Sequence, residues 1–83
     1  MDNELFTEHV QVERKTFSFS LRENPRGRFL RITEDVGGRR DTIIIPSTGL
    51  AQVAELFKRV VDADLKAGPP QIQPEPPPAG TLP

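Results

Sequence analysis

Six of the eight arginines of this 83-residue chain lie between Leu21 and Arg40, and a phenylalanine, Phe29, stands among them. The same stretch carries only three acidic residues, so it is locally basic although the whole chain has a net charge of −1. Guanidinium groups pair with phosphates, and exposed aromatic rings stack on unpaired bases. The combination predicts binding of single-stranded DNA or RNA, because a duplex hides the faces of its bases.

The direction of the Phe29 side chain follows from strand alternation. If residues 29–33 form a strand, Phe29, Arg31 and Thr33 share one face while Leu30 and Ile32 share the other. The outer face would then carry an aromatic ring flanked by arginines. Two alternatives stay open: Phe29 is buried against a partner chain or a curled sheet, and each arginine alone occupies a solvated surface position.

Residues suited to catalysis or metal binding are scarce. Cysteine is absent and His9 is the single histidine, so neither a thiol nucleophile nor a structural zinc site is expected. Glu34 and Asp35 are neighbours on a predicted strand, which turns their carboxylates to opposite faces. Gly37 and Gly38 lack the lysine of a phosphate-binding loop. We therefore expect no enzyme activity, no metal, no cofactor and no small-molecule substrate.

The folding unit is small. Residues 68–83 hold seven of the nine prolines and are predicted to form a disordered tail, which leaves residues 1–67 as one domain. A chain of this size buries only about 60% of its unfolded surface and is commonly stabilised by disulfides, a metal or a partner chain. Because the first two are not expected, the size predicts a homodimer.

Neither membrane insertion nor secretion is indicated. No apolar run approaches the roughly 20 residues that span a bilayer. Residues 1–4 lack the basic and apolar regions of a signal peptide. We expect no membrane partner and a cytoplasmic location, or a nuclear one in a eukaryote.

Four strands are predicted ahead of a helix. Residues 6–13 and 16–22 alternate in opposite phase, so the chain must turn or bulge at residues 13–15. Asparagine, proline and glycine predict a loop over residues 22–28. A Gly-Gly turn then separates strands at residues 29–35 and 41–45. The predicted fold class is α+β: a four-stranded antiparallel sheet plus one C-terminal helix.

The helix is predicted to begin with Ser47 as its N-cap and to end at Gly68. Its apolar residues spread over about half of the circumference, which is wider than the stripe that a surface helix needs. One side can cover the sheet while the other meets a second chain. The predicted dimer interface consists of Leu50, Val53, Leu56, Phe57, Val60 and Val61.

Residues 15–32 resemble the core of a PUR repeat, in which an aromatic-rich strand leads through a basic-Glu-Asn loop into Arg-Gly-Arg-Phe-Leu-Lys-Ile or a close variant. Residues 42–49 are similar to the matching segment of plant purine-rich-element-binding proteins. The resemblance runs from about Glu8 to Leu65. It implies a ββββα repeat that pairs with a second repeat by swapping helices into a Whirly-like domain. Since this sequence holds one repeat, two chains should form that domain.

The resemblance also implies binding of purine-rich single strands in transcription or RNA regulation, and it assigns roles to residues. Arg22 and Arg26 stand at the basic positions of the loop, Asn24 at the amide and Phe29 at the stacking aromatic. Arg22 replaces a common lysine, and Glu13 stands where a neutral amide is frequent. The predicted nucleic-acid-binding residues are Arg14, Lys15, Arg22, Asn24, Arg26, Arg28, Phe29 and Arg31.

A second class of function stays open from the sequence. The chain could be a non-catalytic homodimeric scaffold for protein–protein interactions that uses the sheet and the proline-rich tail. This alternative predicts that the loop arginines can be neutralised without functional loss. It also predicts weak oligonucleotide binding that collapses at modest salt, because only charge would hold the strand.

Overall fold

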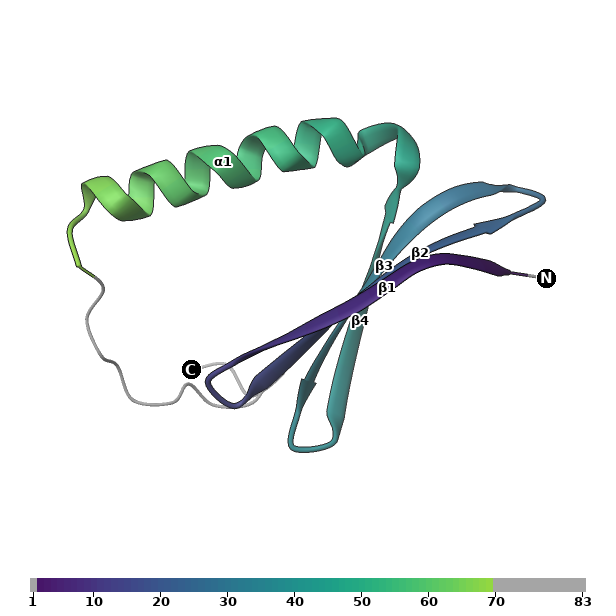
Figure 1. Ribbon diagram of the computed structural model, residues 1–83, viewed down its shortest axis with the longest axis horizontal. Helices are drawn as coiled ribbons and strands as arrows, with labels where there is room; N and C mark the ends of the chain where they lie inside the picture. The colour runs from purple at the N-terminus through teal and green to yellow at the C-terminus, as the bar shows by residue number, and fades with distance from the viewer. Residues whose placement is uncertain (1, 70–83) are drawn as a thin grey trace. The chain divides into compact units, whose positions relative to one another are not determined.

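The computed structural model describes residues 2–69, which form four strands, one short 3-10 helix and one α-helix (Figure 1). This confirms the predicted fold class of a four-stranded antiparallel sheet followed by one helix. The predicted tail lies outside the described residues beyond Pro69. The elements are β1 (Asn3–Val12), β2 (Lys15–Asn24), β3 (Gly27–Val36), β4 (Arg39–Pro46), η1 (Ser47–Gly49) and α1 (Leu50–Lys66).

The chain divides into two compact units, Met1–Thr48 with the sheet and Gly49–Pro83 with the helix. The sheet is a meander in the order β1-β2-β3-β4, and each strand pairs antiparallel with its neighbour in sequence. Two residues connect each pair of strands. The turn predicted around residue 13 is confirmed at Glu13 and Arg14, and the Gly-Gly turn at residues 37 and 38.

The connection between β2 and β3 is shorter than the predicted loop over residues 22–28, which was wrong in its extent. Strand β2 continues to Asn24, β3 begins at Gly27, and only Pro25 and Arg26 form the turn. The side-chain oxygen of Asn24 accepts a 2.9 Å hydrogen bond from the backbone N–H of Arg26. Because this bond closes the turn locally, the flanking residues are left to extend the strands.

The register of the strands separates the side chains into two faces. Residues opposite each other on neighbouring strands share a face, and successive residues alternate. The apolar face carries the apolar residues Phe6, Val10, Val12, Phe17, Phe19, Leu21, Leu30, Ile32, Val36, Ile43 and Ile45, and also the charged residues Glu8, Lys15, Glu23, Arg28, Glu34, Arg39 and Asp41. The polar face carries Glu4, Thr7, His9, Gln11, Thr16, Ser18, Ser20, Arg22, Asn24, Phe29, Arg31, Thr33, Asp35, Arg40, Thr42, Ile44 and Pro46.

A β-bulge interrupts this alternation near the start of β1. The register shifts between Glu4, which pairs with Arg22, and Phe6, which pairs with Leu21. The extra residue is Leu5, of which 48% remains exposed. A bulge inserts one residue into one strand and re-aims the side chains beyond it. Glu4 therefore lies on the polar face, although strict alternation from Phe6 would place it on the apolar face.

The α-helix begins two residues later than the sequence predicts. A 3-10 turn occupies Ser47–Gly49, and the N-cap of α1 is Gly49 without any side-chain hydrogen bond, so Ser47 is not the N-cap. The predicted end is confirmed. Gly68 has a positive φ of 94°, and its N–H donates to the carbonyl of Leu65 at 3.1 Å. A glycine in this conformation is a common helix stop.

No apolar side chain among residues 2–69 is buried, and Ser20 is the most enclosed residue, with 8% of its surface exposed. On the helix, Phe57 and Val60 are each 63% exposed. No helix within residues 2–69 is long and apolar enough to cross a membrane. Several large apolar side chains of the described part of the chain are therefore exposed to solvent, where a partner can cover them.

Candidate nucleic-acid interface

The polar face carries the predicted combination of an aromatic ring, arginine and hydroxyl groups. Arg22 on β2 lies opposite Phe29 on β3, and Ser20 lies opposite Arg31. Because opposite residues share a face and stand about 5 Å apart, these four side chains form one continuous patch. The structure thus confirms the predicted direction of Phe29 and Arg31, which lie on the face opposite to Leu30 and Ile32.

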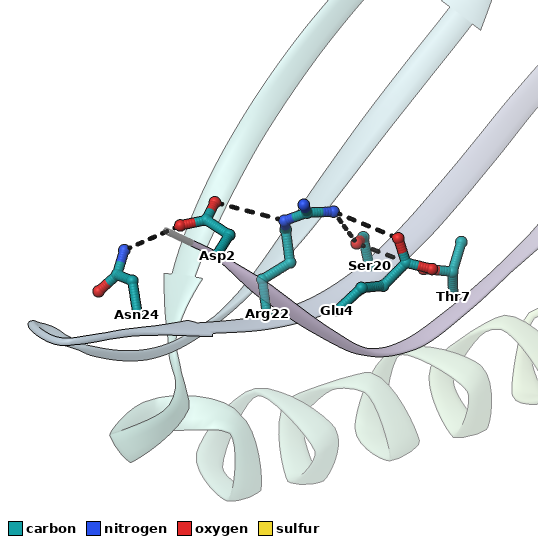
Figure 2. Close-up of polar contacts among 6 residues, drawn as sticks. All are labelled: Asp2, Glu4, Thr7, Ser20, Arg22 and Asn24. Atoms are coloured by element: carbon teal, nitrogen blue, oxygen red, sulfur yellow. Dashed lines mark hydrogen bonds and ion pairs between the residues drawn. The ribbon is translucent and has the colours of Figure 1, made fainter.

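Arg22 is the most contacted cation of this patch (Figure 2). Its Nη1 donates to Ser20 Oγ at 3.2 Å and lies 3.5 Å from Glu4 Oε1, while its Nε donates to Asp2 Oδ2 at 3.4 Å. Only 20% of the Arg22 side chain is exposed. Thr7 donates to Ser20 Oγ at 3.4 Å and so continues the network onto β1. The guanidinium group is therefore held close to the sheet.

Asn24 lies beside this network, at the end of β2, with both halves of its amide engaged. Its Oδ1 accepts from the backbone N–H of Arg26 at 2.9 Å, and its Nδ2 donates to Asp2 Oδ1 at 3.3 Å (Figure 2). The bond to the Arg26 backbone fixes the orientation of the amide, because only oxygen can accept there. With its Oδ1 already accepting one hydrogen bond, Asn24 offers mainly its Nδ2 donor group to a ligand.

A shallow pocket of about 200 Å³ lies at this end of the sheet. Four of its lining residues were predicted as binding residues, whereas Gly27, Ile44 and Pro46 were not. Ile44 lies opposite Arg31 on β4, and Pro46 lies opposite Phe29. Residues 43–45 of β4 are three successive isoleucines, so their own pattern does not show which of them faces the ring. The pairing of β4 with β3 shows that Ile44 and Pro46 lie on the same face as Phe29. The pocket is lined by Asn24, Arg26, Gly27, Arg28, Phe29, Ile44 and Pro46.

Arg14 and Lys15 lie apart from Arg22 and Phe29, whereas Arg28 lines the pocket beside Phe29. Arg28 pairs with Glu23 across the strands, and its Nη2 lies 3.0 Å from Glu23 Oε2, on the side of the sheet opposite to Phe29. Lys15 pairs with Val36 at the other end of β2 and contacts Glu34 Oε2 at 2.9 Å. Arg14 belongs to the β1–β2 turn, at that same far end.

The far end of the polar face has a second pocket, of about 400 Å³, lined by Thr16, Ser18, Thr33, Asp35 and Arg40. Asp35 Oδ1 accepts from the backbone N–H of Gly38 at 3.0 Å, and Asp35 Oδ2 accepts from Arg40 Nε at 3.1 Å. The hydrogen bond from Gly38, followed by that from Arg40, holds the pKa of Asp35 below its ordinary value. Asp35 thus links Arg40 to the backbone of this turn.

Taken together, the polar face offers a ring for stacking, amide donors and several guanidinium groups, with hydroxyl groups between them. Its acidic groups are Asp2, Glu4 and Asp35, each of which contacts an arginine. Among residues 2–69 no group of three or more His, Cys, Asp or Glu side chains could hold a metal ion. The chemistry available here is recognition by stacking, hydrogen bonds and charge.

Comparison with known proteins agrees with this geometry. Residues 2–71 match the family model described as PurA ssDNA and RNA-binding protein. The chain is 46% identical over 63 residues to Transcription factor Pur-alpha 1 of Arabidopsis thaliana, and the alignment covers 76% of this chain and 21% of that protein. The chain thus spans about a fifth of the length of that relative. Since the family model matches most of the sequence, the predicted resemblance is confirmed, and the chain belongs to the PurA ssDNA and RNA-binding protein family.

Proposed function

We propose that this protein binds single-stranded DNA or RNA on the polar face of its sheet, prefers purine-rich strands, and acts through that binding in transcription or RNA regulation. The observation that carries the proposal is the placement of Phe29 opposite Arg22 on an open sheet face. The family membership and the name of the Arabidopsis relative support it.

The pocket beside Phe29 suits one nucleobase. A base stacks on the ring, with the apolar atoms of Ile44 and Pro46 at its edge. Stacking on an aromatic side chain contributes about 1–3 kcal/mol per base. Arg26, in the exposed turn, and Arg31, opposite Ser20, then reach the phosphates on either side of the stacked nucleotide.

A preference for purines follows from stacking area and from the fixed amide of Asn24. Purines offer a larger ring than pyrimidines to Phe29. The Nδ2 group of Asn24 is a hydrogen-bond donor, and the bond from the Arg26 backbone to Oδ1 fixes the orientation of the amide. Guanine presents two acceptors, N7 and O6, on one edge, so it is the base that such a donor suits best.

Arg14 and Lys15 contribute only when the bound strand is long enough to reach them. They lie at the opposite end of β2 from Asn24, and ten strand residues extend over roughly 30 Å. Short oligonucleotides should therefore bind through Arg22, Asn24, Arg26, Phe29 and Arg31 alone. Arg28, which is paired with Glu23, adds general positive charge near the pocket.

The functional unit is a homodimer in which two ββββα chains exchange helices to form a Whirly-like domain. Support comes from the exposed apolar side chains of α1. Burial of apolar surface stabilises association by about 25 cal/mol per Å² before its entropic costs. The interface residues are Leu50, Val53, Leu56, Phe57, Val60 and Val61.

Fluorescence anisotropy tests the binding function directly. A labelled purine-rich single strand, its pyrimidine complement and the duplex of the two are titrated with protein at physiological salt. We expect the purine strand to bind most tightly and the duplex most weakly. Absence of binding to all three would refute the proposal and favour the scaffold function.

A further inference from the structure

Two carboxylates occupy the donors that the proposed site needs for its ligand. Asp2 bridges Arg22 and Asn24, with one oxygen 3.4 Å from Arg22 Nε and the other 3.3 Å from Asn24 Nδ2. Glu4 lies 3.5 Å from Arg22 Nη1 on the other side of the guanidinium group (Figure 2). Arg22, with one positive charge, is thus contacted by two negative charges.

The β-bulge at Leu5 makes this arrangement possible. Regular alternation from Phe6 would turn Glu4 toward the apolar face, away from Arg22. The inserted residue restores Glu4 to the polar face, opposite Arg22, and Asp2 reaches Asn24 from the same edge. The strand deviates from regular pairing at the one place that brings the acids to the proposed binding residues.

The carboxylates bind in the manner of a phosphate. A phosphate placed between Arg22 and Asn24 would accept the same hydrogen bonds that the two oxygens of Asp2 accept. The contacts of 3.3–3.5 Å are at the long end of the hydrogen-bond range. Asp2 is 36% exposed and Glu4 54% exposed, and exposed ion pairs of this kind are weak. A ligand can therefore displace them.

We propose that Asp2 and Glu4 are an intramolecular competitor for the phosphate backbone, so that the free protein is autoinhibited at Arg22 and Asn24. The proposal rests on the function proposed above. A strand that gains only charge contacts is then disfavoured, because it must displace two carboxylates and approach their charge. A strand that also stacks on Phe29 binds despite them. The acids raise selectivity for unpaired bases over generic polyanions.

The double variant Asp2→Asn with Glu4→Gln tests the proposal by anisotropy with the purine-rich strand. We expect its affinity at low salt to exceed that of the wild type by about three- to thirtyfold, as the loss of two exposed carboxylate contacts allows. The salt slope should steepen by about 0.7, because Arg22 gains one phosphate contact. The control variant, Glu8→Gln with Asp64→Asn, makes the same change in net charge away from Arg22.

A second titration is independent of nucleic acid. The Arg22 Nε–Hε signal is followed by NMR while inorganic pyrophosphate is added to the wild type, the double variant and the control. We expect the double variant to bind pyrophosphate at a lower concentration than the other two. If none of the three proteins binds the purine-rich strand but the double variant still binds pyrophosphate more tightly, the proposed function is wrong. The competition of Asp2 and Glu4 for an anion at Arg22 would then still hold.

Two results would overturn the inference itself. One is an affinity of the double variant equal to or weaker than that of the wild type in either titration, which would make the acids positioning groups or bystanders. The other is an equal gain in the control variant, which would reduce the effect to net charge.

Discussion

Arg22 and Phe29 are direct cross-strand partners on β2 and β3, on the face of the sheet that also carries Ser20 and Arg31. A ring and a guanidinium group in this relationship can hold a base and its phosphate at the same time, since each group of the nucleotide meets its own partner. The sheet, and not a loop, sets the distance between the ring of Phe29 and the guanidinium group of Arg22. This rigidity makes the contribution of each residue separable by substitution.

Phe29→Ala should weaken binding of the purine-rich single strand by about 1–3 kcal/mol, because one stacked base loses its platform. The loss should be similar at all salt concentrations, since stacking releases no counterions. Anisotropy at three or more salt concentrations measures both quantities. The control Phe29→Tyr keeps an aromatic ring and should retain most of the affinity. Unchanged affinity in Phe29→Ala, with the wild-type salt slope, would contradict stacking at this position.

Arg26→Ala should mainly reduce the salt dependence of binding. Arg26 lies in the exposed turn beside the pocket, and removing one phosphate contact to a single strand lowers the slope of log K against log salt by about 0.7. Arg28→Ala is the matched comparison two residues away, because Arg28 lines the same pocket but its guanidinium group is paired with Glu23. Its slope should change less. Equal slopes in the two variants would show that position on the sheet is irrelevant to the contact.

The β3–β4 turn should loosen in acid. The pKa of Asp35 is lowered by the hydrogen bonds from Gly38 and Arg40, so its carboxylate stabilises the turn above the ordinary value of about 4. That contribution is lost as the pH falls below about 4 and through the lower pKa of the folded protein. We expect the Gly38 amide shift to titrate with a midpoint below about 4 and to lose this titration in Asp35→Asn. A midpoint at or above the ordinary value would contradict this stabilisation.

Phe57→Glu should disrupt the proposed dimer. Phe57 is 63% exposed on α1, and a charge placed in an apolar interface has no partner there. We expect the dimer dissociation constant to rise on the order of a hundredfold or more, measured by sedimentation. Gln52→Glu adds the same charge to the same helix outside the predicted interface and should leave the constant nearly unchanged. A dimer that survives Phe57→Glu would require a different interface.

Local patterns of the sequence predict much of the fold. The opposite phases of Val10 and Phe17 predict the first turn, the Gly-Gly pair predicts the third, and the apolar spacing from Leu50 predicts the helix. These features depend on residues that are close together in the chain, so periodicity and turn chemistry are sufficient to find them. The direction of Phe29 followed from the same alternation.

The features that were missed depend on partners distant in sequence. The bulge at Leu5 is evident only from the pairing of β1 with β2. That Ile44 shares a face with Phe29 is evident only from the pairing of β4 with β3. The loop around Pro25 was predicted too long because proline and asparagine mark a turn without giving its length. Ser47 is a favourable N-cap type, but an intervening 3-10 turn moves the helix start to Leu50. Pairing register is the information that a single sequence lacks.

The two-residue turns have a consequence for how the protein comes to its native state. Every strand pairs only with its sequence neighbours, so the sheet has a low contact order and little loop-closure entropy to overcome. Hairpins of this kind form in roughly 1–10 μs. The chain should therefore complete its sheet in a fast phase independent of concentration. In the proposed homodimer, association of the two chains is then the slow, concentration-dependent step, so dilution should delay dimer formation without delaying formation of the sheet.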